Sequence, residues 1–587
     1  MTRIHGDVDR FVDDALEGLV LAHRDELQRV DGGVIRRHPL GSGHVAVVIG
    51  GGSGHYPSFA GLVGRGLAAG AVCGNIFTSP SAGQAFRVAQ AVETGGGVLF
   101  SYGNYAGDVI HFGEAERRLR EHGIDARTVL VTDDVASAPR EEAHRRRGIA
   151  GDLVVFRIAG AAAERGDSLD EVERVARLAN DRTRTLGVAF SGCTLPGGSE
   201  PLFTVPEGMM SVGLGIHGEP GIRDVPLQSA PQLVRTLLDP LLAERPDAAG
   251  SRVAVIVNGL GTVKYEELFV LFRYLVQELD AAGLEIVEPE CGELVTSLDM
   301  AGVSLTLCWL DAELEELWRA PAYTPAYRKG AMTTVPDATP DVAPSSVGEQ
   351  PSPTATRSVP DGSVDAAGRA LRFLAVARTR IAGEVDELGR LDAVAGDGDH
   401  GIGMLRGLTA AADAAEAAGD GVGLAVALEN AGDAWSERAG GTSGALWGAA
   451  LRSLGASLGD AETYGPEDLV VALGAARDRI VELGGARIGD KTMLDAIVPF
   501  GETFADAVEG GASVPAALRS AADAAWSAAE ATASLSPRLG RARPLAERSV
   551  GHPDPGAISF AIIVRALADD VDAASATVQG RGEAGAV

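Results

Sequence analysis

Residues 45–59 read VAVVIGGGSGHYPSF, an apolar run followed by a glycine-rich turn. The first five residues are small or β-branched, which predicts a buried strand. Glycines directly after a strand predict a tight turn at its carboxyl end, where open α/β sheets bind ligands. His55 lies in this turn. We therefore expect an α/β sheet with a histidine at its carboxyl edge.

Two further turns carry polar residues of the same kind. The predicted strand VLFS, residues 98–101, runs into YGNYAGD, which ends at Asp108, and GLGIHGEPG, residues 213–221, places His217 among four glycines. Singly, His55 could cap a helix, Asp108 could be an N-cap, and His217 could lie in an ordinary surface turn. Together the three residues could supply a base, an orienting group and a nucleophile.

The order of elements predicts an α/β class for the first half of the chain. Apolar runs that we interpret as strands occur at residues 129–132 (VLVT), 153–158 (LVVFRI) and 253–257 (VAVIV), and they alternate with helical patterns such as residues 168–187. Such alternation is typical of α/β proteins.

A proline-rich segment predicts the domain boundary. Residues 331–363 contain six prolines and almost no large apolar residue, which is typical of an extended, mobile linker. We divide the chain into domains at residues 1–330 and 366–587, joined by a linker at 331–365. Residues 408–419 and 514–534 are rich in Ala at helical spacing, so the second domain is predicted to be a helical bundle.

Composition limits the classes of partner. The chain has 587 residues and a net charge of -30, which argues against nucleic acid or an anionic membrane as the main partner. It contains no run of 18 apolar residues, and its first twenty residues lack the apolar core of a signal peptide, so we expect a cytoplasmic protein. The four cysteines form no CxxC pair, so neither a disulfide framework nor a zinc site is indicated.

An acidic loop in the second domain predicts a metal site. LDAVAGDGDHG, residues 391–401, holds Asp392, Asp397 and Asp399, and this density of hard oxygen ligands suits Mg²⁺ or Ca²⁺. An EF-hand is excluded because position 12 counted from Asp397 is Leu408 instead of Glu. The structural alternative is a solvated acidic turn.

A second loop in this domain predicts a phosphate site. AGGTSG, residues 439–444, leads into a helical pattern, and backbone N–H groups at a helix N-terminus bind phosphate oxygens. Residues 485–492, GARIGDKT, resemble a P-loop only superficially, because Asp490 separates Gly489 from Lys491.

These motifs resemble the dihydroxyacetone kinase family along nearly the whole chain. Residues 1 to about 330 are similar to its ketose-binding domain through GGGSGHYPSF, CGNIFTSPSAGQ, GNYAGDV, RRRGIAGDLVVFRIAGAAAE, GLGIHGEPG and GELVTSLDMAGVSLTL. Residues from about 366 to 575 are similar to its nucleotide-binding domain through LDAVAGDGDHG, AGGTSGALWG, GDKTMLDAIVPF and GRARPLAERSVGHPDPGA. The resemblance implies a two-lobed α/β domain, the proline-rich linker, and an all-α bundle or barrel that binds the nucleotide.

The resemblance also implies roles for individual residues. His217 would hold the substrate ketone as a covalent hemiaminal, Asp108 would accept the proton of the attacking primary hydroxyl, and His55 would orient the substrate. The remaining expected substrate contacts are Gly52, Ser53, Gly54 and Gly103. Two Mg²⁺ ions would be held by Asp392, Asp397 and Asp399. The ATP contacts would be His400, Gly401, Gly441, Thr442, Ser443, Met493, Arg541, Asp554, Pro555 and Gly556.

The fusion of the two domains in one chain bears on the phosphoryl donor and on the oligomeric state. Some family members take phosphate from a phosphotransferase relay, but this chain carries both domains without a relay domain, so we expect ATP as an exchangeable substrate. In fused relatives the helical domain caps the active site of the other subunit. We therefore expect a homodimer in which the linker lets the helical domain of one chain reach the α/β active site of the other.

The sequence is compatible with more than one substrate and more than one activity. Many family members read K-N-Y-T-G-D before the catalytic Asp, whereas this chain reads G103-N-Y-A-G-D108, and loss of the lysine could admit a four-carbon ketose such as D- or L-erythrulose as well as dihydroxyacetone. The rival interpretation is that another side chain refills the space. The other activities considered are a non-catalytic ketose-sensing regulator and an FAD-AMP lyase that forms cyclic FMN with Mn²⁺.

Overall fold

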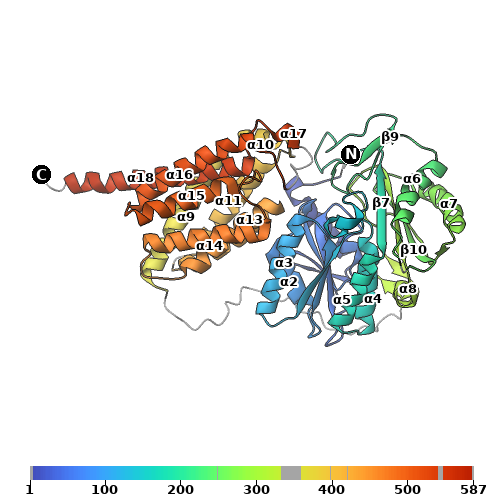
Figure 1. Cartoon of the computed structure of the whole chain (residues 1–587). Helices are drawn as coiled ribbons and strands as arrows, with labels where there is room; N and C mark the ends of the chain where they lie inside the picture. The colour runs from blue at the N-terminus through green and yellow to red at the C-terminus, as the bar shows by residue number, and fades with distance from the viewer. Residues whose placement is uncertain are drawn as a thin grey trace. The chain divides into compact units, whose positions relative to one another are not determined.

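The computed structural model describes residues 4–247, 249–331, 359–396, 398–419, 421–539 and 546–584, with side chains up to residue 573. The chain forms two compact units, Met1–Glu349 and Gln350–Val587, each described here by itself (Figure 1). The division falls inside the segment for which we predict a mobile linker. Residues 332–358 of that segment lie outside the described residues, so its mobility stays a prediction.

The predicted end of the linker is wrong by five residues. Helix α9 (Asp361–Ala382) begins directly after Pro360, so residues 361–365 are helical. The buried Ser363 hydroxyl donates to Oδ1 of Asp460 at 2.7 Å and accepts from the backbone N–H of Leu424 at 2.8 Å. These two hydrogen bonds fix the first turn of α9 to the rest of the helical unit, which composition alone does not reveal.

The first sheet of the N-terminal unit has six strands in the order β1-β2-β4-β3-β5-β6. Strands β4, β3, β5 and β6 are parallel, and β1 and β2 are antiparallel additions. The strands predicted at residues 45–49, 98–101 and 129–132 are confirmed. The bounds are β1 (Leu27–Val30), β2 (Gly33–Arg36), β3 (Ala46–Ser53), β4 (Gly70–Ile76), β5 (Val98–Gly103) and β6 (Ala126–Val131).

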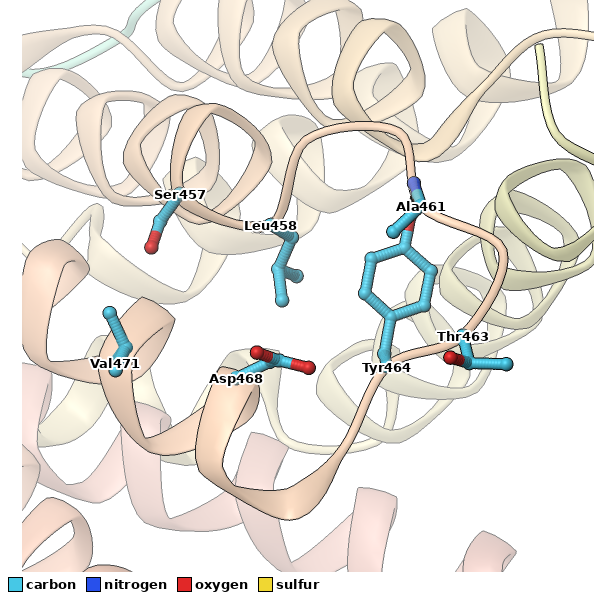
Figure 2. A pocket seen from close by; sticks show the side chains of 7 residues that line it. All are labelled: Ser457, Leu458, Ala461, Thr463, Tyr464, Asp468 and Val471. Atoms are coloured by element: carbon cyan, nitrogen blue, oxygen red, sulfur yellow. Dashed lines mark hydrogen bonds between the residues drawn. The ribbon is translucent and has the colours of Figure 1, made fainter.

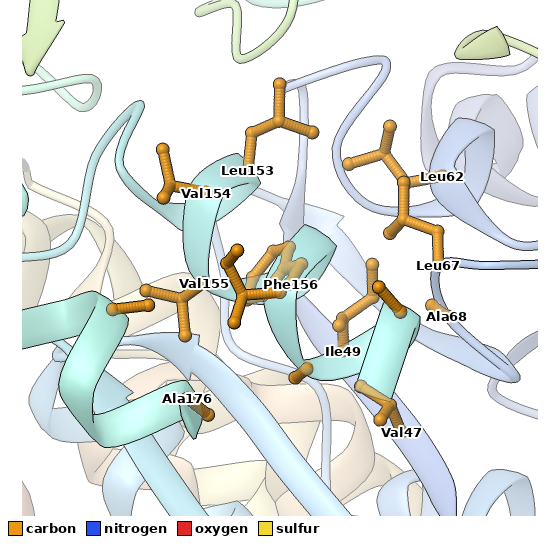
Figure 3. Close-up of a cluster of buried hydrophobic side chains, with 14 of the residues drawn as sticks. Val47, Ile49, Leu62, Leu67, Ala68, Leu153, Val154, Val155, Phe156 and Ala176 are labelled. Atoms are coloured by element: carbon orange, nitrogen blue, oxygen red, sulfur yellow. The ribbon is translucent and has the colours of Figure 1, made fainter. Parts of the chain in front are cut away.

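Helices cover both faces of this sheet, as the alternation of side chains in β3 requires. Ala46 and Val48 belong to the core formed with α2 (Ala82–Val92) and α3 (Ala106–Glu121). Val47 and Ile49 belong to the opposite core, formed with α4 (Asp152–Arg165) and α5 (Leu169–Asp181). Figure 3 shows Val47 and Ile49 beside Phe156 of α4.

Residues 153–158, which we predict as a strand, are instead part of α4. Every residue of α4 from Asp152 to Ala163 is buried, because the same core also contains Ile256 of the second sheet and Trp318 of α8 (Ala312–Arg319). A helix buried on all sides is apolar all round and therefore resembles a buried strand in sequence.

The second sheet has seven strands, with β11-β10-β13-β7-β8-β9 in order and β12 paired to β10. Its face opposite α4 is covered by α6 (Ala230–Ala243) and α7 (Tyr265–Ala281). The predicted strand at residues 253–257 lies within β10. The bounds are β7 (Thr183–Ala189), β8 (Met209–Val212), β9 (Arg223–Pro226), β10 (Arg252–Gly259), β11 (Glu285–Ile286), β12 (Glu290–Gly292) and β13 (Gly302–Trp309). The unit also contains α1 (Phe11–Ala22) and the ladder of β14 (Ala322–Tyr323) with β15 (Arg328–Lys329).

The second unit is helical, as predicted. Two helices of this unit, α12 and α13, approach each other closely at Gly432, where there is no side chain. A Cβ added there would lie only 2.6 Å from the carbonyl oxygen of Gly448. Trp435 and Trp447 stack beside this contact with ring centroids 5.0 Å apart. The bounds are α10 (Val385–Asp392), α11 (His400–Ala417), α12 (Leu424–Ala439), α13 (Gly441–Leu458), α14 (Pro466–Gly484), α15 (Leu494–Glu509), α16 (Val514–Ala531), α17 (Ala546–Ser549) and α18 (Pro555–Ala584). In the described ranges, no helix is both long enough and apolar enough to cross a membrane.

Candidate active site

His217 lies in the loop between β8 and β9, and the carboxylate of Glu219 holds it at two points. The backbone N–H of His217 donates to Oε2 at 2.5 Å, and its ring Nδ1 donates to Oε1 at 2.8 Å. Burial alone would raise the pKa of Glu219, but His217 and Arg147 hold that pKa well below its ordinary value. Glu219 is therefore a carboxylate at neutral pH.

His55 lies in the turn after β3 and faces His217. Its Nδ1 donates to the carbonyl oxygen of Thr296 at 2.8 Å, and its Nε2 lies 3.0 Å from Nε2 of His217. Burial, with help from the neighbouring His217, lowers the pKa of His55 to about 3. Two turns from different sheets thus meet at a pair of imidazoles.

The proton count of this pair follows from its partners. A carbonyl and a carboxylate only accept hydrogen bonds, so Nδ1 of both histidines carries a hydrogen. Two Nε2 atoms at 3.0 Å also need a hydrogen between them, since two lone pairs would repel. The pair therefore shares one positive charge opposite Glu219.

Aromatic rings enclose the His217 imidazole. Phe77 stacks on His55 at 5.1 Å and meets His217 edge to face at 5.2 Å, while Tyr105 meets His217 edge to face at 4.8 Å. The Tyr105 hydroxyl donates to the carbonyl oxygen of Gly148 at 3.0 Å. A Cβ added at Gly103 would lie 3.0 Å from the Tyr105 ring and 3.1 Å from that same carbonyl oxygen. The space beside Gly103 is therefore filled by Tyr105 and Gly148.

Asp108 lies in the first turn of α3 and is buried. Burial raises its pKa to about 7, although the Ser79 hydroxyl and His217 both lower it. Among the described residues, no group donates a hydrogen bond to Oδ1 of Asp108. A buried carboxylate that titrates near neutrality and has a free oxygen can accept a proton from a bound molecule.

The glycines of the β3 turn are required by close neighbours. A Cβ added at Gly52 would lie 2.6 Å from the backbone N of Thr78, and one added at Gly54 would lie 2.8 Å from the Phe77 ring. Gly54 also has φ of +107°, which favours glycine. The Ser53 hydroxyl donates to the carbonyl oxygen of Gly74 at 2.7 Å, so its hydrogen is used within the protein.

Two residues essential to this geometry are missing from the sequence prediction. Arg147 lies 3.6 Å from Glu219 and forms a 2.7 Å ion pair with the buried Asp134. Glu219 itself lies two residues after His217 within the glycine run, and that proximity is the signal that could have identified it. Arg147, distant in sequence, has no comparable signal apart from its place in the RRRGIAGD motif.

In the helical unit, Gly441, Thr442 and Ser443, which we predict to lie in the loop before a helix, already form the first turn of α13. Gly440 and Gly441 have φ of +66° and +60°, which turn the chain sharply into the helix. Within the described part of the chain, the buried Ser443 hydroxyl oxygen has no hydrogen-bond partner. Free N–H groups and an orphaned hydroxyl at a helix N-terminus fit a phosphate group.

The acidic loop lies beside the N-terminus of α11. Oδ2 of Asp392 accepts the backbone N–H of Gly398 at 2.8 Å, and Asp399 is the N-cap residue of α11. Asp397 lies outside the described residues, and among the residues that the structure does describe, no group of three His, Cys, Asp or Glu could hold a metal ion. The predicted set of three ligands therefore stays a prediction.

The first turn of α11 contacts the start of α18. Nε2 of His400 lies 2.9 Å from the Ser559 hydroxyl, and burial lowers the pKa of His400 to about 4. An added Cβ at Gly401 would lie 2.2 Å from the carbonyl oxygen of Val385, so Gly401 allows α10 and α11 to pack closely. The loops predicted to bind the nucleotide thus gather at one end of the helical unit.

The start of α18 also meets the start of α15. Asp554 caps α18 by accepting the backbone N–H of Ala557 at 2.8 Å, and burial raises its pKa to about 7. Pro555 is the first residue of α18, and an added Cβ at Gly556 would lie 3.4 Å from Cβ of Met493, the N-cap residue of α15. Arg541, the remaining predicted contact, lies outside the described residues.

The false P-loop before α15 is a turn closed by Asp495. Its carboxylate accepts the backbone N–H groups of Gly489 at 2.6 Å and Thr492 at 2.8 Å. Lys491 is buried with φ of +62°, and its ammonium group donates to the carbonyl oxygens of Ser549 at 2.6 Å and Leu535 at 3.2 Å. Lys491 therefore holds the turn before α18 in place and does not face a phosphate in the manner of a P-loop lysine.

A pocket of about 290 Å³ lies at the other end of α13 (Figure 2). It is lined by Leu458, Tyr464, Asp468 and Val471, among others, and the Tyr464 hydroxyl is used in a hydrogen bond to Gly459 at 2.9 Å. With 18 residues, α13 is about 27 Å long, which separates this pocket from Gly441. We assign the pocket no part in the site.

Comparison with known proteins gives full-length matches. Residues 17–326 match the Dak1 domain, and residues 394–569 match the DAK2 domain. A D-erythrulose kinase of Mycolicibacterium smegmatis is 54% identical over 576 residues, 97% of this chain and 99% of that protein. An L-erythrulose kinase of Pectobacterium atrosepticum is 52% identical over 572 residues, 97% of this chain and 96% of that protein. The crystal structure of the dihydroxyacetone kinase from C. freundii in complex with AMP-PNP and Mg²⁺ is 30% identical, with a TM-score of 0.52 and coverage of 97% of this chain and 99% of that chain.

The contacts of Lys491 predict how the turn before α18 responds to its removal. Lys491→Met keeps the length of the side chain but leaves two buried carbonyl oxygens without their charged donor, which costs about 1–3 kcal/mol. We expect faster hydrogen–deuterium exchange in residues 546–554, measured by mass spectrometry. Lys264→Met, at an exposed position, serves as the control. Equal protection of residues 546–554 in both variants would contradict the assignment.

Proposed function

Because the chain belongs to the dihydroxyacetone kinase family and is an ATP-dependent ketose kinase, we propose that it phosphorylates the terminal primary hydroxyl of a short ketose bound covalently to His217. The observation that carries the proposal is the arrangement of His217 between Glu219 and His55. This arrangement leaves Nδ1 of His217 occupied and directs Nε2 toward His55. Asp108 belongs to the same site, since His217 lowers its pKa.

Capture of the ketone needs two proton transfers and one new bond. The proton between the two Nε2 atoms moves onto His55, which frees the lone pair on Nε2 of His217. That lone pair attacks the carbonyl carbon, and the carbonyl oxygen takes the proton from His55 to become the hemiaminal hydroxyl. A short ketose offers few groups to bind, so a reversible covalent bond selects it against polyols that lack a carbonyl.

Asp108 then acts as the general base for phosphoryl transfer. Its free Oδ1 accepts the proton of the substrate's primary hydroxyl as that oxygen attacks the γ-phosphorus of ATP. Burial raises the pKa of Asp108 to about 7, so the ionised form is both populated at neutral pH and more basic than an ordinary carboxylate.

The first turn of α13 is the proposed phosphate site. The N–H groups of Gly441, Thr442 and Ser443 and the orphaned Ser443 hydroxyl would bind phosphate oxygens. Asp392, Asp397 and Asp399 would hold Mg²⁺, which we propose as two ions that neutralise phosphate charge when bound. The binding of AMP-PNP and Mg²⁺ by the C. freundii relative supports both assignments. His400, Met493 and the turn at residues 554–556 would complete the nucleotide site.

A four-carbon ketose is the proposed substrate, on different grounds from those that the sequence offered. The space beside Gly103 is filled by Tyr105 and Gly148, so the missing lysine leaves no simple cavity. The identity of 54% and 52% to a D- and an L-erythrulose kinase carries the proposal instead. These two values are too close to separate the enantiomers.

Transfer requires the two units to meet, and we propose that they do so between chains of a homodimer. The helical unit of one subunit would cap the ketose site of the other. This proposal rests on the family pattern and on the proline-rich segment between the units.

A substrate panel tests the activity. ADP release should be measured with dihydroxyacetone, D-erythrulose, L-erythrulose and glycerol, and we expect at least one erythrulose to match dihydroxyacetone in kcat/KM while glycerol is inactive. His217→Ala should lose the sp³ adduct signal of a ¹³C-carbonyl-labelled ketose in NMR but still bind ATP. A preference for dihydroxyacetone of more than about tenfold over both erythruloses would contradict the four-carbon assignment. Absence of ADP release with every ketose would contradict the kinase assignment.

The raised pKa of Asp108 predicts an acid limb in the pH profile of kcat. The base acts only when ionised, so kcat should rise with pH through a midpoint of about 7 and level off at higher pH. Ser79→Ala removes a hydroxyl that lowers this pKa, so the midpoint should move to higher pH by roughly one pH unit. Ser191→Ala, at an exposed site, is the control. An unchanged midpoint in Ser79→Ala would remove Asp108 from the titrating step.

Mixed dimers test capping between subunits. His217→Ala disables one unit and Asp399→Ala the other, so each variant alone should be inactive. If the helical unit caps the partner, co-expression creates dimers with one intact site and restores about a quarter of the parental activity by random pairing. Activity that stays at background in isolated mixed dimers would show that the two units act within one chain.

A further inference from the structure

We propose that Glu219 is the positioning residue of the covalent step: it fixes the His217 imidazole by a two-point contact and balances the positive charge that the ring carries in the ketose adduct. This inference rests on the proposed capture of the ketone by His217. It adds a residue that the sequence analysis does not include among the site residues.

The two-point contact sets both the backbone and the ring of His217. One carboxylate oxygen accepts the backbone N–H at 2.5 Å, and the other accepts Nδ1–H at 2.8 Å. Fixing Nδ1 leaves Nε2 as the only ring nitrogen that can attack, and it points Nε2 at His55, 3.0 Å away. The turn is closed further by the backbone N–H of Gly215, which donates to the carbonyl oxygen of Glu219 at 3.1 Å.

The chemistry of the adduct requires a negative charge at this place. Before attack, the two imidazoles share three protons and one positive charge. After attack, the carbonyl oxygen has taken one proton, His55 is neutral, and His217 carries its Nδ1 hydrogen and a new Nε2–C bond. The ring of His217 is then an imidazolium ion, so the positive charge has stayed in the pair. The Glu219 carboxylate is in direct contact with that ring at Nδ1.

The Glu219 carboxylate is itself contacted by a charged side chain. The Arg147 guanidinium lies 3.6 Å from Oε2 of Glu219 and is itself paired with Asp134 at 2.7 Å. An added Cβ at Gly215 would lie 2.0 Å from Oε2 of Glu219 and 2.5 Å from Nη1 of Arg147. Gly215 therefore provides the space in which carboxylate and guanidinium meet. The glycines around His217 therefore have two roles: they leave its imidazole accessible to a ligand, and they make room for the ion pair of Glu219 and Arg147.

Glu219→Gln tests the charge while keeping the length of the side chain. The glutamine oxygen can still accept Nδ1–H, but the negative charge is gone and the amide NH2 group cannot accept the backbone N–H of His217. With ¹³C-carbonyl-labelled dihydroxyacetone, we expect the fraction of bound ketose present as the sp³ adduct to fall about 10- to 100-fold, with a similar loss in kcat/KM. Binding of the unreacted ketose, measured by calorimetry, should change little. Glu207→Gln makes the same change at an exposed site of the same unit and should behave as the parent.

The outcomes separate this inference from the proposed function. Parental amounts of adduct in Glu219→Gln would overturn the role of Glu219 while leaving covalent capture intact. No adduct in the parent itself would overturn covalent capture, and this inference with it. A merely structural role would lower covalent and non-covalent binding together, and that result also counts against the proposal.

A measurement on the parent makes the test independent of the folding of any variant. In protein labelled with ¹⁵N-histidine, coupling to the ¹³C of the ketose identifies Nε2 of His217 in the adduct. We expect the other ring nitrogen to show the chemical shift and attached proton of an imidazolium ion. A neutral imidazole in the adduct, with no hydrogen on Nδ1, would overturn the charge-balancing role.

Discussion

Burial of α4 on every side is the constraint on which the geometry of the ketose site depends. The helix lies between the two sheets of the first unit, with residues 152–163 all buried. Asp133, which follows β6, anchors the loop before α4, because its carboxylate accepts the backbone N–H groups of Ile149 and Gly151 at 2.9 and 2.7 Å. That loop carries Arg147 and Gly148. A hydrophobic packing requirement far from the histidines therefore determines where the groups behind and beside His217 lie.

The same burial explains the electrostatics of the site. Asp133 and Asp152 are buried beside α4, and burial raises the pKa of both, to about 6 for Asp133. Asp108 belongs to the same environment and contributes to the raised pKa of Asp152. Neighbouring carboxylates oppose the ionisation of Asp152, whereas for Asp108 burial is the effect that raises the pKa to about 7. The apolar core thus sets the reactivity of Asp108 as well as its position.

Local patterns predicted much of this molecule. A strand that ends in glycines places His55, and strand β5 followed by a turn places Asp108, because such turns are short and leave the chain few alternatives. The strand predicted at 153–158 fails for a physical reason: composition cannot distinguish two buried faces of a helix from two buried faces of a strand. Ser363 shows the same limit at the linker, where a pair of tertiary hydrogen bonds decides where α9 begins. Glu219 and Arg147 belong to the site through their contacts with each other and with His217. Local sequence patterns cannot show that residues 147 and 219, which are far apart in the chain, contact each other. The metal ligands remain predicted from sequence, since Asp397 lies outside the described residues.

The hydrogen that joins the two imidazoles has a consequence for binding in solution. If the ketose adds to His217 as proposed, the proton that completes the hemiaminal hydroxyl is already present in the free protein, between Nε2 of His55 and Nε2 of His217. Covalent capture then neither takes up a proton from the buffer nor releases one to it. The affinity for the ketose is then independent of pH over the range in which the shared proton is retained. Protons are exchanged with water only in the later step at Asp108.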